Sequence, residues 1–148
     1  MKILIKNRKA EFNYEFLEKF EAGIQLLGCE VKSVKNGLIS LDGASAQFYN
    51  GELYLINASI PPWQLANAPD NYDSNRSRKL LLHKKELNYL IGKTKSEHLM
   101  IIPTAIYLKK NKIKVELKLG RIRLKVDKRE VIKKREIRKE IEKNIKAY

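Results

Sequence analysis

The sequence predicts a mainly β protein, built as a small barrel of short strands with one inserted helix and a basic C-terminal tail. Three observations predict it: two pairs of β-prone segments flank turn signals, only one body segment has a secure helical pattern, and basic residues continue past the last strand. The chain has 148 residues, which suits one compact domain plus an appendage. Its net charge of +14 favours a polyanionic partner.

Residues 12–26 alternate apolar and polar side chains, which indicates extended structure. Apolar residues occupy even positions from Phe12 to Leu26, and polar residues fill most positions between them. Two consecutive strands or one bent strand fit this period. A helix over residues 14–21 fits as well, because Phe12, Phe16 and Phe20 are four apart and Gly23 could end it. The pattern alone leaves both interpretations open.

Two hairpins are predicted from turn residues between β-prone segments. Asn50-Gly51 separates residues 47–49 from residues 52–56, and this dipeptide supplies the positive φ angles of a type I′ turn. The second hairpin joins residues 106–108 to residues 113–117 through a strongly basic segment from Lys109 to Lys112.

The apolar positions change parity at Gly120. They are odd from residue 113 to residue 119 and even from Ile122 to Val126. Because a slip of one residue exchanges the two faces of a strand, a bulge or tight bend at Gly120 would keep both apolar sets inside. The same prediction places five basic side chains in water: Lys114, Lys118, Arg121, Arg123 and Lys125.

One helix is predicted in the body. Residues 83–91 place Leu87, Leu90 and Ile91 on one face, and Gly92 follows as a C-terminal stop. The preceding residues 61–75 are rich in Pro, Asn and Asp and predict a long loop. Loops of this length inside a compact domain are usually functional or mobile.

Composition separates the C-terminal residues from the body. Nine basic and four acidic residues follow residue 127, a net charge of +5 that leaves +9 for the body. Ile137, Ile141 and Ile145 recur every four residues, but a single column of isoleucines buries little surface. We therefore expect a body of residues 1–127 and a tail of residues 128–148 that is disordered when free and folds on binding. A terminal helix packed on the body is the alternative.

The sequence contains no motif of a catalytic or metal site. A glycine-rich phosphate loop, a dinucleotide fingerprint, His-Glu-x-x-His and Gly-x-Ser-x-Gly are all missing. His83 and His98 are isolated, and the single Cys29 is expected to be a small buried residue rather than a nucleophile. No catalytic residue, metal site or cofactor is predicted. Neither a secretory signal nor a run of about 20 apolar residues is present, which predicts a cytoplasmic protein.

Nucleic-acid binding remains, and the sequence modestly favours RNA. A small barrel with basic loops can hold single strands or irregular RNA through backbone contacts and base stacking. Candidate stacking residues, each equally suited to packing, are Tyr49, Tyr54, Trp63, Tyr72 and Tyr107. A small nuclease or RNA-modifying enzyme and a ribosomal structural protein remain alternatives at this point.

Several ordered sequence blocks are more specific than composition. They are Asn7-Arg8-Lys9-Ala10, Phe20-Glu21-Ala22-Gly23-Ile24, Glu30-Val31-Lys32-Ser33, Gly51-Glu52-Leu53, Arg76-Ser77-Arg78-Lys79-Leu80-Leu81-Leu82, Lys85-Glu86-Leu87, the hairpin of residues 107–117 and Asp127-Lys128-Arg129-Glu130. In this order the blocks resemble the SsrA-binding protein family, the small protein B family of bacterial trans-translation. The resemblance extends from about residue 7 into the basic tail.

The resemblance implies a closed oligonucleotide-binding (OB)-type β-barrel with flanking helices that binds the tRNA-like domain of transfer-messenger RNA. Proteins of the family deliver this RNA to stalled ribosomes. There the tail enters the vacant mRNA channel at the small-subunit decoding centre and becomes helical. The resemblance therefore implies a noncatalytic factor without cofactor or metal, with no membrane partner, that is a monomer when free.

The resemblance also assigns candidate residues. The body positions expected to bind RNA are Asn7, Arg8, Lys9, Glu30, Lys32, Ser33 and Lys114, to which we add the basic pair Arg121 and Arg123. The positions that match the start of the ribosome-binding tail are Asp127, Lys128 and Arg129, followed by Lys133, Lys134 and Arg135. The Glu30 carboxylate either accepts hydrogen bonds from base or ribose, or holds a neighbouring Arg or Lys in place. A purely fold-stabilising salt bridge is the alternative.

One segment departs from the family pattern. The family usually carries Ala-Lys-Gly-Lys-Lys before the tail, whereas this chain has Gly-Arg-Ile-Arg-Leu at residues 120–124. Charge is kept at the second and fourth positions, but the glycine moves upstream. This shift agrees with a bulge at Gly120 and removes glycine from the position where the family could use it to approach RNA closely.

Overall fold

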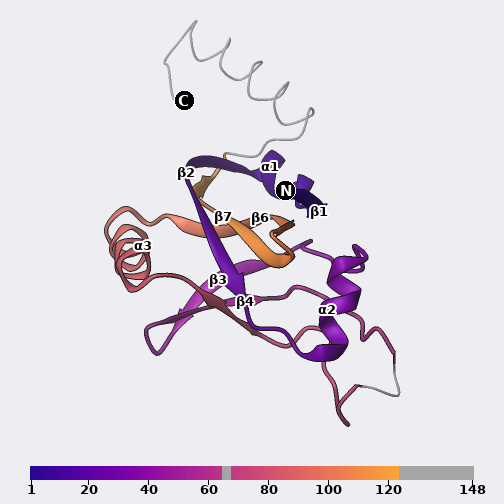
Figure 1. Cartoon of the computed structure of the whole chain (residues 1–148). Helices are drawn as coiled ribbons and strands as arrows, with labels where there is room; N and C mark the ends of the chain where they lie inside the picture. Colours follow the sequence, from indigo (N-terminus) through magenta and orange to yellow (C-terminus); the bar gives the residue numbers. More distant parts are fainter. Residues whose placement is uncertain (65–67, 124–148) are drawn as a thin grey trace, which may run out of the picture.

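The computed structural model describes residues 1–64 and 68–123 (Figure 1). Seven strands and three helices follow one another along this part of the chain. In order they are β1 (Lys2–Lys6), α1 (Arg8–Asn13), β2 (Tyr14–Ile24), α2 (Gly28–Lys35), β3 (Ser45–Tyr49), β4 (Glu52–Ile56), β5 (Arg78–Leu81), α3 (Lys84–Glu97), β6 (Met100–Lys109) and β7 (Lys112–Ile122).

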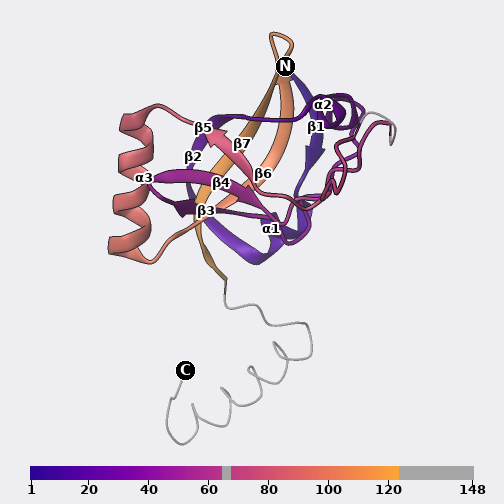
Figure 2. The ribbon, with the colours of Figure 1, turned by 90° about the horizontal axis from the view of Figure 1, so that it is seen from below.

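The strands close into a barrel-like ring, as the sequence predicts. All pairings are antiparallel, and the sheet order is β1-β6-β3-β4-β5-β2-β7 with an additional β6–β7 pairing that closes the ring and leaves β1 beside β6. The long strand β6 makes this closure possible, because it pairs with β7 along one edge and with both β1 and β3 along the other. Helices α2 and α3 lie on opposite sides of the barrel (Figures 1 and 2).

Both predicted hairpins are present and have two-residue turns. Asn50 and Gly51 join β3 to β4 with φ angles of 50° and 76°. Lys110 and Asn111 join β6 to β7 with φ angles of 51° and 63°. Positive φ at both central residues is the signature of a type I′ turn, whose twist matches that of the paired strands.

Residues 14–24 form one strand, so the helical interpretation of residues 14–21 is wrong. The helix precedes this segment instead, as the short α1. Strand β2 pairs with β7 along almost its whole length, and the pairing shifts by one residue between Phe16 and Glu18. Leu17 is therefore an extra residue on β2 that bends the strand, which is the bent form allowed by the alternation.

The predicted bulge at Gly120 is wrong, because the extra residue lies on β2. Beyond Gly120 the strand simply leaves the core, and Ile122 is 64% exposed rather than buried. Glycine is required for a different reason. A Cβ at residue 120 would lie 2.8 Å from both the Glu15 carbonyl oxygen and Cδ1 of Phe16.

Helix α3 continues through Gly92, so the predicted C-terminal stop at this glycine is wrong. The helix ends at His98, which adopts the left-handed conformation with φ 53°. A glycine inside a helix costs about 1 kcal/mol relative to alanine. Burial of Leu87 and Leu90 against the barrel, and a hydrogen bond from the Tyr89 hydroxyl to Glu18 on β2, offset this cost. Tertiary packing therefore stabilises α3 enough to tolerate Gly92, and the Lys93–Glu97 ion pair at 3.2 Å supports its last turn.

The barrel interior holds the hydrophobic core. Its fully buried side chains come from every part of the ring and include Leu53, Leu55, Leu80, Val115, Leu117 and Leu119. Cys29 is buried, as predicted, and both histidines are exposed. Within residues 57–64 and 68–77 the connection from β4 to β5 contains no helix or named strand, which agrees with the predicted long loop.

The tail predictions lie outside the described residues. This applies to the division at residue 127 and to the tail candidates Asp127, Lys128, Arg129, Lys133, Lys134 and Arg135. Among the residues described, no helix is long and apolar enough to cross a membrane.

Candidate nucleic-acid interface

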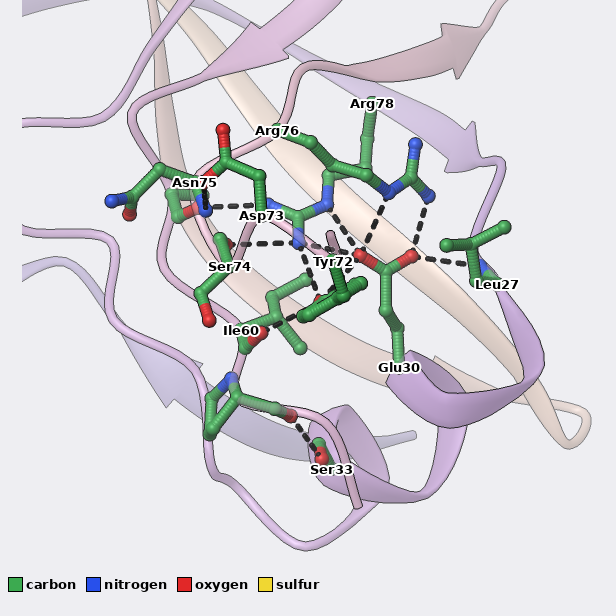
Figure 3. Close-up of polar contacts among 12 residues, drawn as sticks. Leu27, Glu30, Ser33, Ile60, Tyr72, Asp73, Ser74, Asn75, Arg76 and Arg78 are labelled. Atoms are coloured by element: carbon green, nitrogen blue, oxygen red, sulfur yellow. Dashed lines mark hydrogen bonds and ion pairs between the residues drawn. The ribbon is translucent and has the colours of Figure 1, made fainter. Parts of the chain in front are cut away.

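A buried carboxylate joins α2 to the connection between β4 and β5 (Figure 3). Glu30 is the third residue of α2, and its Oε1 accepts a hydrogen bond from the backbone N–H of Leu27 at 2.7 Å. This contact satisfies one of the amide groups that a helix start leaves without an intrahelical partner. The side chain itself is 0% exposed. An ionised group this deep must be paired, because desolvation of an unpaired charge is costly.

Two arginines and a tyrosine supply the pairing. Arg76 donates to Glu30 from Nε at 3.0 Å and from Nη2 at 2.5 Å, and Arg78 donates from Nε at 2.9 Å and from Nη2 at 2.5 Å. The Tyr72 hydroxyl donates to Oε2 at 2.9 Å. Arg78 is fully buried, whereas the side chain of Arg76 is 30% exposed. The network therefore carries an excess positive charge, and Arg76 presents part of it to solvent.

The protonation states of this network follow from its contacts. Burial alone would raise the pKa of Glu30, but hydrogen bonds from Arg76, Leu27, Arg78 and Tyr72 together lower it to about 2. Burial and the hydrogen bond to Glu30 raise the pKa of Tyr72 to about 12. At neutral pH the carboxylate is therefore ionised and the phenol remains a donor.

The outer side of α2 borders a pocket of about 540 Å³. Its lining includes Gly28, Cys29, Val31, Lys32, Lys35 and Trp63. The backbone N–H of Trp63 donates to the Cys29 carbonyl at 2.8 Å, and the Ser33 hydroxyl donates to the Pro61 carbonyl at 2.5 Å. These bonds hold the loop backbone against α2, so that Trp63 lines the same pocket as the exposed side chains of Lys32 and Lys35. An accessible aromatic ring next to cations is suited to a stacked base and its phosphate.

Three residues that the sequence predicts to bind RNA, Asn7, Glu30 and Ser33, are buried in this structure and make contacts within the protein. Asn7 is 3% exposed; it caps α1 through the Ala10 N–H and donates to the carbonyls of Leu41 and Pro103. Ser33 is fully buried against the loop. Glu30 holds neighbouring arginines, which is the second of the roles considered for its carboxylate, and the same bonds stabilise the fold.

The other predicted residues are accessible but do not form one cluster. Lys32 borders the pocket beside α2. Arg8 and Lys9 are exposed on α1, while Arg121 and Arg123 are exposed at the end of β7. Lys114 is half-buried in a separate pocket of about 330 Å³ that also contains Glu21.

The structure adds residues that the sequence did not single out. Lys35 lies on the pocket beside Lys32, and Arg76 and Arg78 hold Glu30. Arg76 and Arg78 stand in one of the blocks that carry the family resemblance, and their alternate spacing allows both side chains to lie on one face, but the sequence does not reveal their buried partner. Among the described residues, no cluster of His, Cys, Asp or Glu could hold a metal ion.

The predicted aromatic stacking residues divide by exposure. Trp63 is 39% exposed and Tyr49 is 67% exposed, so both rings are accessible. Tyr72 is committed to the Glu30 network through its hydroxyl. Tyr107 is buried and donates a hydrogen bond to Glu21, which agrees with the packing role that the sequence also allowed for it.

Comparison with known proteins identifies the family. The model of the SmpB protein family matches residues 4–147. The chain belongs to the SmpB family. SmpB relatives include the SsrA-binding protein of Trichormus variabilis, 42% identical over 99% of this chain and 95% of the relative. The SsrA-binding protein of Synechococcus elongatus is 45% identical, again over 99% of this chain and 95% of the relative.

A solved SmpB structure has the same fold. It is described as "tmRNA-SmpB: a journey to the center of the bacterial ribosome" and is 40% identical in sequence. The similarity covers 97% of this chain and 98% of that chain, with a TM-score of 0.66. The predicted resemblance and the predicted mainly β, barrel-like fold are both confirmed.

Proposed function

We propose that this protein is a noncatalytic factor of trans-translation that binds the tRNA-like domain of transfer-messenger RNA and delivers it to stalled ribosomes. The observation that carries the proposal is the pocket beside α2, where Trp63 lies next to Lys32 and Lys35 on a helix fixed by the Glu30 network. The relatives support it, because they are named SsrA-binding proteins and a similar solved chain is described with tmRNA and the ribosome.

The chemistry of the body is suited to gripping folded RNA. Lys32, Lys35 and the exposed edge of Arg76 offer cations to phosphate groups, and Trp63 offers a ring to a base left outside a helix. Arg8, Lys9, Lys114, Arg121 and Arg123 add positive charge on other surfaces. Phosphate contacts of this kind give affinity that falls with salt concentration.

The division of labour between body and tail is the second part of the proposal. Residues 1–127 bind the RNA, and residues 128–148 enter the vacant mRNA channel of the small subunit. The basic residues of the tail, including Lys133, Lys134 and Arg135, suit a channel lined by RNA phosphate. Function on the ribosome places the protein in the cytoplasm.

A titration against two nucleic acids tests the first part. Binding to transfer-messenger RNA and to an unrelated DNA duplex of equal length should be compared at several salt concentrations. We expect tighter binding to transfer-messenger RNA at every concentration. Equal affinity for both would contradict the proposal, because it would reduce the interaction to nonspecific charge.

Removal of residues 128–148 tests the second part. The shortened chain should bind transfer-messenger RNA within about twofold of the full chain but fail to support peptide tagging on stalled ribosomes. A full-length chain with Lys133, Lys134 and Arg135 changed to Gln keeps the tail length, and it should likewise bind transfer-messenger RNA but support less tagging. Loss of RNA binding together with tagging would contradict the division of labour.

A further inference from the structure

The two tight hairpins of the barrel have the same turn geometry but very different residues. The β3–β4 turn uses Asn50 and Gly51, the dipeptide that best tolerates positive φ at both positions. The β6–β7 turn uses Lys110 and Asn111 at nearly the same angles. A lysine with φ 51° lies in the left-handed region, which side chains other than Gly, Asn and Asp rarely adopt.

The residues that flank the β6–β7 turn, like those within it, are less favourable for a hairpin than those of the β3–β4 turn. Tyr49 lies directly opposite Glu52 in the β3–β4 hairpin, whereas Lys109 lies directly opposite Lys112 in the β6–β7 hairpin. Like charges opposite each other on neighbouring strands destabilise a sheet. Glu21 compensates only Lys109, at 3.4 Å from its Nζ. Within residues 1–64 and 68–123, neither Lys110 nor Lys112 makes a salt bridge.

These lysines gather at one end of the molecule. Strand β1 pairs with β6 so that Lys2 lies opposite Leu108, which adds a fourth lysine beside the turn. We call Lys2, Lys109, Lys110 and Lys112 the basic tip. Figure 2 shows the β6–β7 turn at one end of the barrel next to the N-terminus, and the last residues of β7 at the opposite end. The basic tip is therefore remote from the point where the chain continues beyond residue 123.

We propose that the basic tip is an RNA contact in its own right, binding the phosphate backbone without base specificity. Lys110 is unfavourable at a turn position with positive φ, and Lys109 opposite Lys112 is an unfavourable strand pair. Such locally unfavourable residues are expected at functional sites. Ammonium groups on flexible stems bind phosphate as point charges. The proposal rests on the proposed function and extends it, since it adds a second site to the pocket beside α2.

A double variant of the basic tip tests this proposal. Lys110→Asn with Lys112→Thr removes two charges and restores favourable turn and strand residues. The slope of log affinity against log salt should become shallower by about 1.8, so that the wild type loses about 12-fold more affinity than the variant between 50 and 200 mM salt. The melting temperature should stay equal or rise, because the replaced lysines are locally unfavourable.

A second double variant provides the matched control. Lys85→Gln with Lys95→Gln removes the same charge from exposed positions of α3, on the opposite side of the barrel from α2. We expect the control to retain the wild-type slope. A control as strongly affected as the tip variant would overturn the proposal, because net charge alone would then explain both results.

Two arms identify the RNA that the basic tip contacts. One measures binding to free transfer-messenger RNA and the other measures binding of the preformed complex to stalled ribosomes. A shallower slope for the tip variant in either arm supports the proposal and assigns the contact; unchanged slopes in both arms overturn it. Failure of the proposed function is a separate result, seen when the wild type shows no preference for transfer-messenger RNA over the DNA duplex.

Discussion

The Glu30 carboxylate gives the sharpest quantitative prediction. Changing Glu30 to Gln keeps the shape of the side chain but removes its charge and places an amide N–H₂ where one oxygen accepts from an arginine. Arg78, which is fully buried, then loses its counter-ion. Arg76 loses the partner that orients it but remains partly in water. The variant therefore tests both the stability of the fold and the position of an exposed cation.

The contacts set the size of the effect. A pKa lowered from 4.5 to about 2 corresponds to about 3 kcal/mol in favour of the ionised carboxylate in the folded state. Loss of one partner from a buried ion pair typically costs about 3–5 kcal/mol. We expect Glu30→Gln to lower the free energy of unfolding at pH 7 by an amount in this range. This is a large part of the roughly 5–15 kcal/mol that stabilises a typical domain.

The pH dependence has a defined sign. Because the folded state depresses the pKa of Glu30, its stabilising effect is fully present above pH 4.5 and is lost as the pH falls toward 2. The wild type should lose about 2 kcal/mol of this contribution by pH 3, whereas Glu30→Gln has none to lose. The difference in the free energy of unfolding between wild type and Glu30→Gln should therefore be smaller at pH 3 than at pH 7 by about 2 kcal/mol.

Urea unfolding followed by circular dichroism at pH 7 and pH 3 measures both quantities. Glu52→Gln is the matched control, since Glu52 pairs with Lys79 at 3.6 Å on the surface and should cost less than about 1 kcal/mol. A cost for Glu30→Gln within 1 kcal/mol of the control at pH 7 would refute the reasoning. The reasoning would also be refuted if the free energies of unfolding of Glu30→Gln and wild type differed by the same amount at pH 7 and at pH 3.

Three further substitutions separate binding from folding. Trp63→Ala should weaken binding to transfer-messenger RNA by about 1–3 kcal/mol at unchanged melting temperature, and a filter-binding titration with unchanged affinity would remove the pocket from the interface. Gly120→Ala should cost about 1–3 kcal/mol in urea unfolding, because the new Cβ would meet Phe16 and the Glu15 carbonyl at 2.8 Å; full stability would contradict this close approach. Asn7→Ala should cost about 1–2 kcal/mol through loss of its capping bond while the folded protein keeps its RNA affinity, and a selective loss of affinity would restore Asn7 as a direct contact.

Features that depend on neighbouring residues could be predicted from the sequence. The Asn50-Gly51 turn and the basic turn before Lys112 both appear where their residues place them, because turn type follows from the φ angles that a few consecutive residues allow. The alternation of apolar and polar residues after Phe12 is compatible with the bent strand that forms, but it could not exclude a helix. Strand and helix periods coincide at spacings of four, so only pairing with β7 resolved them.

Features that depend on distant residues could not be predicted. Helix α3 tolerates Gly92 because burial of Leu87 and Leu90 against the barrel stabilises the helix by more than one glycine costs. Gly120 is constrained by the ring of Phe16, far away in the sequence, rather than by a bulge in its own strand. The predictions of a stop at Gly92 and a bulge at Gly120 used local sequence alone, whereas contacts with distant residues decided both.

The sequence by itself determined the charge of the molecule, its small-barrel architecture and, through ordered motifs, its family. Only the tertiary structure decided which polar residues of those motifs face solvent. Glu30 and Arg78 are 48 positions apart, and burial arises where such segments meet. A charge buried there must be paired, so Glu30 holds Arg76 and Arg78, whereas Lys32 of the same helix lies at the pocket beside α2.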